Sequence, residues 1–117
     1  MTADQRQKSY EKALAELSRA GAGWVLFADK ANGDNYVEVG ADLRVEVSHR
    51  RWPGSKLPPL GPAALTKLAS LGFREAERNL AGSWSGWTFP RMARQLEAIF
   101  LEGLGCAPGF DLEVTRG

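Results

Sequence analysis

The stretch WVLFADKANGDNYVEVGADLRVEV, residues 24–47, decides the fold of this 117-residue chain. Trp24–Ala28 is a short apolar run of residues that favour strands, which predicts a central strand covered on both faces. Through residues 36–48 apolar and polar residues alternate, as they do in strands with one buried face. Asn32-Gly33 and Gly40–Asp42 supply the residues that favour turns. The stretch therefore predicts a meander of three antiparallel strands.

The Gly40–Asp42 loop also predicts how the second hairpin is paired. If this loop closes the hairpin directly, Val39 faces Leu43, and Glu38 lies opposite Arg44 as a favourable cross-strand pair. Glu38 and Glu46 are both expected to point outward into solvent, so we do not interpret them as a catalytic carboxylate pair.

Three helices are expected around the meander. A capping-box pattern begins at Thr2 and precedes a helix over Ala3–Ala20, and Gly21 is the type of residue that commonly ends a helix. Further helices are expected over residues 62–71, beginning with a proline, and from residue 90 to either Gly103 or Gly105. Each of the three carries its apolar residues on one stripe, which indicates packing against a sheet or another helix.

The segments between the helices are less regular. Residues 50–62 contain four prolines and are expected to form a loop. Short strands are predicted at residues 79–84 and 87–89, and a last strand at residues 110–114. The resulting order, α-β-β-β-α-(β)-(β)-α-β, predicts a single α+β domain over residues 1–117, an antiparallel sheet with helices packed on it.

Composition excludes several classes of partner. Lys and Arg number 15 against 14 acidic residues, a net charge of +1, so we expect neither a nucleic acid nor a membrane partner. The chain has one cysteine, Cys106, no recognisable signal peptide and no apolar run of membrane-spanning length. These features predict a soluble, cytoplasmic protein.

The only histidine, His49, is the natural starting point in a search for catalytic groups. A nucleophile with an orienting acid, or further metal ligands, would have to accompany it, and neither set is recognisable. We therefore predict no catalytic residue, no metal and no cofactor. The alternative is a small enzyme or ligand-binding domain that uses His49 with Arg50 or Arg51 in a pocket.

Aromatic and arginine residues gather in the irregular segments. Both kinds of residue are favoured at protein interfaces. The predicted partner-binding residues are Trp52, Trp84, Trp87, Phe89, Arg50 and Arg51. The alternative is that the tryptophans close the ends of a small core.

Several segments carry a family resemblance. They are WVLF at 24–27, LRVEVSxR at 43–50, LxxL at 57–60, LxxLGF at 68–73, AxxLxxIF at 93–100 and LxV at 112–114. Together they resemble the YbjN-like proteins, which are grouped with the type III secretion chaperones as peptide-binding domains. The resemblance spans roughly residues 5–115. It implies a helix-sheet sandwich, often dimeric, that holds a segment of a client protein on a hydrophobic surface.

The function expected from the sequence is therefore non-enzymatic. We expect a chaperone-like or adaptor domain, a homodimer, that binds a protein or peptide client. Binding would occur by addition of a strand to a sheet edge or by burial in a groove.

Overall fold

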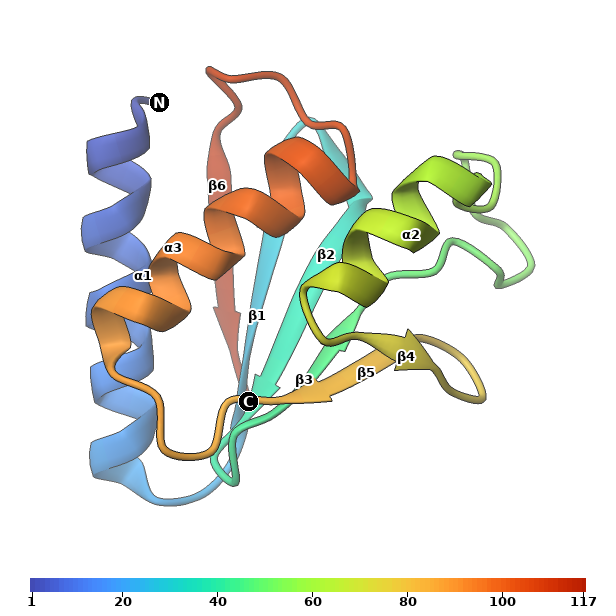
Figure 1. Cartoon of the computed structure of the whole chain (residues 1–117). Coiled ribbons are helices and arrows are strands. Elements are labelled where there is room, and N and C mark those ends of the chain that lie inside the picture. The colour runs from blue at the N-terminus through green and yellow to red at the C-terminus, as the bar shows by residue number, and fades with distance from the viewer.

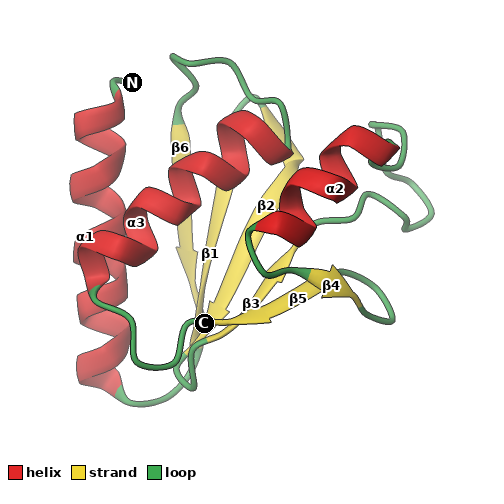
Figure 2. Cartoon of the chain, viewed as in Figure 1, coloured by secondary structure: helices red, strands yellow, loops and turns green.

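The computed structural model describes every residue from 1 to 117 and shows the expected α+β class and element order. Six strands form one antiparallel sheet, and three α-helices pack on one side of it (Figures 1 and 2). The elements are α1 (Ala3–Ala20), β1 (Trp24–Asp29), β2 (Asn32–Gly40), β3 (Arg44–Val47), α2 (Pro62–Ser70), β4 (Arg74–Glu75), β5 (Leu80–Ser83), α3 (Phe89–Ala98), a π-helical turn (Ile99–Gly103) and β6 (Leu112–Arg116).

The strands lie in the order β4-β5-β3-β2-β1-β6 across the sheet. β1, β2 and β3 form the predicted meander. From β3 the chain passes through α2 to the β4–β5 hairpin, and from β5 it passes through α3 to β6 at the opposite edge. α3 therefore crosses the sheet, as Figure 1 shows, and covers the strands between the two edges.

The two faces of the sheet have different surroundings. The four valines of β2 and β3 are fully buried beneath the helices. Tyr36, Glu38 and Glu46, which alternate with these valines along the two strands, are partly exposed. We call the face that carries these three residues the open face, because all three helices pack on the other side.

Local sequence determines where the helices begin and end. The Thr2 hydroxyl accepts the Gln5 N–H at 3.1 Å and the Gln5 side chain accepts the Thr2 N–H at 2.8 Å, which confirms the predicted capping box. Gly21 ends α1 with a φ of 69°, a left-handed conformation that glycine adopts without steric cost. α2 begins at Pro62, as predicted.

One hydrophobic core joins the helices to the sheet. Tyr10 of α1 meets Phe27 of β1 edge to face, with ring centroids 5.4 Å apart, and stacks on Phe100 at 6.4 Å. All three aromatic rings are completely buried. Their contacts hold α1 against both β1 and the turn that follows α3.

The expectation that β1 is covered on both faces is wrong. β1 lies inside the sheet between β2 and β6, but Trp24 is 38% exposed and Leu26 is partly exposed. These two residues alternate with the buried Val25 and Phe27. A continuous apolar run indicates burial, but it does not tell whether one or both faces of the strand are covered.

The predicted pairing of the β2–β3 hairpin is also wrong. Val39 lies opposite Val45 and Glu38 lies opposite Glu46, so two carboxylates face each other where an ion pair was expected. The loop is longer than predicted because Leu43 leaves the strand, with a φ of 65°, and donates its N–H to Gly40 O at 2.9 Å.

The strand predicted at residues 87–89 does not form. Thr88 precedes α3, and its hydroxyl accepts the Arg91 N–H, so α3 begins at Phe89. The strand predicted at 79–84 is present as β5, whereas β4 was not predicted.

Two other boundaries differ from the predictions. β2 already begins at Asn32, because the turn is formed by Lys30 and Ala31, whose N–H is accepted by the Asp29 carboxylate. β6 begins two residues later than predicted, at Leu112. None of the helices has the length and apolar character needed to cross a membrane.

Candidate functional site

A hollow of about 800 Å³ lies on the open face of the sheet. β2 and β3 form its floor, the loop at residues 51–53 forms one wall, and the turn between β4 and β5 forms another. Its lining consists of Tyr36, Glu38, Arg44, Glu46, Arg51, Trp52, Pro53 and the turn residues Ala76, Glu77, Arg78 and Asn79. We call this the open-face hollow.

Two aromatic rings stand together in the open-face hollow. Trp52 and Tyr36 have ring centroids 5.6 Å apart. The Tyr36 hydroxyl donates to Asn79 Oδ1 at 3.0 Å, which ties β2 to the β4–β5 turn. Both rings are partly exposed and so present apolar surface to an occupant.

The charged groups of the open-face hollow differ in burial. Glu38 and Glu46 are partly buried on the floor, whereas three arginines and one glutamate are exposed at the rim: Arg44, Arg51, Arg78 and Glu77. Burial, and after it the neighbouring carboxylate of Glu46, raises the pKa of Glu38. The site combines an anionic floor, a rim with more arginine than glutamate, and an aromatic wall.

His49 follows β3 by two residues and contacts Glu75 of β4. It is 1% exposed, and its Nε2 is 3.2 Å from Oε1 of Glu75, which also accepts from Arg51 at 3.1 Å. The hydrogen bond from His49, with the charge of Arg51, lowers the pKa of Glu75. Nδ1 of His49 is buried without a partner.

Arg50 points away from His49. With a φ of 61°, it sends its guanidinium to Asn35 Oδ1, at 2.6 and 3.0 Å, and to Leu104 O at 2.8 Å. It therefore fastens the start of β2 to the end of the π-helical turn. Arg50 therefore stands apart from His49. His49 and Arg51 both contact Glu75 Oε1, but of the two only Arg51 lines the open-face hollow.

Trp84 is a core residue. It is 1% exposed, and its indole N–H donates to Gln95 Oε1, whose amide in turn donates to Leu71 O at 3.1 Å. These bonds tie the residue that follows β5 to α3 and to the residue that ends α2. Trp84 thus matches the alternative that tryptophans complete the core, and it offers no surface to a partner.

Trp87 and Phe89 lie at the beginning of α3. Trp87 stacks on Trp84 with ring centroids 6.1 Å apart, and the guanidinium carbon of Arg91 lies over the Trp87 ring, 3.6 Å from its centroid. Phe89 is partly buried against the core. Of the four predicted aromatic residues, only Trp52 lines the open-face hollow, together with the predicted Arg51.

The Cys106 thiol is also accounted for by packing. It is 7% exposed, and burial raises the pKa of the thiol to about 12. Such a thiol is protonated at neutral pH and is a poor nucleophile.

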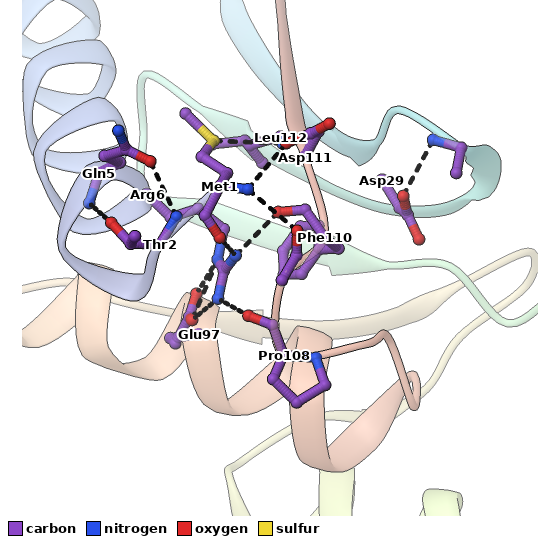
Figure 3. Close-up of polar contacts among 12 residues, drawn as sticks. Met1, Thr2, Gln5, Arg6, Asp29, Glu97, Pro108, Phe110, Asp111 and Leu112 are labelled. Carbon is purple, nitrogen blue, oxygen red and sulfur yellow. Dashed lines mark hydrogen bonds and ion pairs between the residues drawn. The ribbon is translucent and has the colours of Figure 1, made fainter.

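A buried cluster of hydrogen-bonded side chains around Arg6 was also not predicted from the sequence. Arg6 is completely buried and binds both carboxylate oxygens of Glu97 (Figure 3). Glu97 also accepts from the Tyr10 hydroxyl at 3.0 Å. Arg6 further donates to the carbonyl oxygens of Met1, Phe110 and Pro108, each at 2.8 Å. With every donor occupied, this group is structural.

The floor of the open-face hollow was also missed as a site. Tyr36, Glu38 and Glu46 of the floor, like Arg44 at the rim, occupy the polar positions of two alternating strands, which normally face solvent. The predicted strand pairing placed Glu38 opposite Arg44, so the two facing carboxylates of Glu38 and Glu46 were not recognised. Comparisons with family models, with curated proteins and with solved structures gave no match.

Proposed function

We propose that this protein is a non-enzymatic adaptor or chaperone-like domain that binds an extended segment of a partner protein in the open-face hollow. The observation that carries the proposal is the placement of Trp52 against Tyr36 over a sheet face that no helix covers. A volume of about 800 Å³ lies within the range of ligand sites, roughly 300–1,000 Å³.

The physical basis is contact area. Tryptophan and tyrosine bring large rigid surfaces to an interface at a low cost in conformational entropy, and they are frequent among the residues that dominate binding energy. The loop at 51–53 and the turn at 76–79 both line the hollow above the neighbouring strands β2 and β3, and we propose that the extended peptide lies between them.

The edge of β6 offers a second kind of contact. Trp24 and Gly117 exchange both of their backbone hydrogen bonds, at 3.0 and 3.1 Å, so by alternation Val114 and Arg116 direct their N–H and C=O groups away from β1. Unpaired backbone groups on an edge can pair with another strand. We propose this edge as the contact of a homodimer.

Two further considerations support the proposal. The helix-sheet architecture agrees with what the resemblance to YbjN-like proteins implies, although the comparisons gave no match to that family. A single cysteine in a buried position is compatible with the reducing cytoplasm, where we place the protein.

The proposed function is tested by selecting random decapeptides displayed on phage against the purified chain. Peptides recovered on the wild type are synthesised, and their affinities are measured by fluorescence anisotropy. We expect Trp52→Ala to weaken binding by about 2 kcal/mol, roughly thirtyfold, as for an interface anchor.

Trp87→Ala is the matched control, since Trp87 is also partly exposed but lies outside the open-face hollow. Circular dichroism establishes that both variants are folded. Equal affinity of Trp52→Ala and the wild type, or a loss confined to Trp87→Ala, would exclude the open-face hollow as the binding site. Light scattering of the purified chain tests the homodimer, and a strictly monomeric mass would contradict it.

A further inference from the structure

The Glu38–Glu46 pair violates the usual rule for residues that face each other across a sheet. The two residues are opposite in the β2–β3 ladder, and the bond from Ser48 N–H to Tyr36 O shows that Glu38 and Glu46 form a hydrogen-bonded pair. Cβ atoms of such a pair are about 5.5 Å apart, and like charges at this separation repel each other. Opposite charges are the common choice at such positions.

No ion pair compensates the two carboxylates, although Arg44 lies two residues before Glu46 on the same face of β3. Neither of them takes part in any ion pair of the structure. In the ladder Leu26 stands beside Glu38 and Ala81 stands beside Glu46, so the pair is flanked by apolar side chains on both sides. Of the arginines at the rim, Arg51 is already bound to Glu75.

The surroundings of the pair suit a cation. Tyr36 lies two residues before Glu38 on the same face of β2, and the Trp52 ring packs against the Tyr36 ring. A cation that lies over an aromatic ring and next to carboxylates is attracted by both, and each attraction grows stronger as water is excluded.

The rim limits what kind of cation can approach. Arg44 and Arg78 are exposed and belong to no ion pair. Glu77 offsets only one of these two charges, so the rim still repels an occupant with several positive charges. The two arginines attract acidic groups on either side of a single positive charge. The charge pattern of the site is therefore complementary to a peptide with one cation flanked by neutral or acidic residues.

We infer that the peptide bound in the open-face hollow carries a single lysine or arginine whose cation binds Glu38 and Glu46 beside Trp52. This inference rests on the proposed function, since it specifies the occupant of the same site. Acidic residues next to that lysine or arginine meet Arg44 and Arg78.

The test uses the same phage-displayed decapeptides, selected in parallel on the wild type, Glu38→Gln and Glu46→Gln. On the wild type, peptides whose binding depends on Trp52 are expected to be enriched in one lysine or arginine with acidic neighbours. Replacing that residue by glutamine in the synthetic peptide should weaken binding at least tenfold, and Glu38→Gln should do the same to the unaltered peptide.

Glu113→Gln is the matched control, because Glu113 is exposed on the same face of the sheet but outside the open-face hollow. It should bind like the wild type. Thermal unfolding by circular dichroism shows whether Glu38→Gln is folded, and the repulsion that it removes predicts a melting temperature no lower than that of the wild type.

The possible failures are distinguishable. Trp52-dependent peptides without enrichment of lysine or arginine, or with affinity unchanged by Glu38→Gln, would overturn this inference and leave the proposed function intact. A preference for acidic peptides would show that the arginines at the rim dominate, and it would overturn the inference as well. If binding of none of the selected peptides depends on Trp52, both this inference and the proposed function are wrong.

Discussion

Arg6 illustrates how much a single buried side chain contributes to this fold. Its guanidinium binds Glu97 of α3 and the carbonyl oxygens of three other residues, two of them in the segment before β6. It also lies over the Phe110 ring, 4.2 Å from the centroid. Because Arg6 is completely buried, removing it leaves Glu97 and the carbonyl oxygens without their donor.

We therefore predict that Arg6→Met destabilises the protein by about 3–5 kcal/mol, the usual cost of leaving one member of a buried ion pair alone. The double variant Arg6→Met, Glu97→Met should recover part of that loss, because no unpaired charge remains. Urea unfolding followed by circular dichroism measures both. A single variant within 1 kcal/mol of the wild type would contradict a structural role for Arg6.

Glu38 has the opposite character, because its charged form is unfavourable in the folded state. Its pKa is raised in the fold, so the folded state binds the proton more tightly than the unfolded state does. The resulting stability is fully present below the pKa of the unfolded chain and is lost as the pH rises through the higher pKa of the folded state.

Glu38→Gln should consequently be more stable than the wild type at pH 7, by a few tenths up to about 1 kcal/mol, the range of cross-strand pairs. The advantage should shrink as the pH falls through the raised pKa and disappear below the pKa of the unfolded chain. Urea unfolding at a series of pH values measures it. A variant that is less stable than the wild type at pH 7 would show that the carboxylate is compensated in a way that the structure does not contain.

Among the elements, those that begin or end at strong local signals could be predicted from the sequence. The capping box at Thr2, the left-handed Gly21 and the proline at the start of α2 each act within one turn of backbone. The β2–β3 pairing could not be predicted, because it depends on Leu43 adopting a positive φ that a leucine rarely takes. That one residue changed the partner of Glu38 from Arg44 to Glu46 and so changed the candidate site.

β5 offers a direct test of how an element packs. A Cβ added to Gly82 would lie 2.9 Å from two atoms of the Phe73 ring, and Phe73 is only 2% exposed. Gly82→Ala should therefore cost about 1–3 kcal/mol through overpacking. Gly33→Ala in β2 is the control, since a Cβ there meets nothing within 4 Å, and it should change stability by less than about 0.5 kcal/mol. Equal urea midpoints for the two variants would mean that Phe73 does not pack against β5.

On the scale of the whole molecule, all helices and most strands contribute to one core of 23 buried residues. The fold class followed from the sequence because alternation and helical periodicity are repeated over many residues, and single errors in pairing do not alter them. The open-face hollow did not follow, because its walls come from segments far apart in the chain. Tyr36, Trp52 and Asn79 meet only once β3 has been placed between β2 and β5.

The central claim is that a peptide binds on the open face of the sheet and not on the helices. The most direct measurement is a proton-nitrogen NMR titration of the labelled protein with a decapeptide selected on the wild type. We predict that the indole N–H signal of Trp52 and the amide signals of β2, β3 and residues 76–79 shift, while the indole signals of Trp84 and Trp87 remain in place. Shifts confined to Trp87 and the amides of α3, with Trp52 unchanged, would contradict the claim.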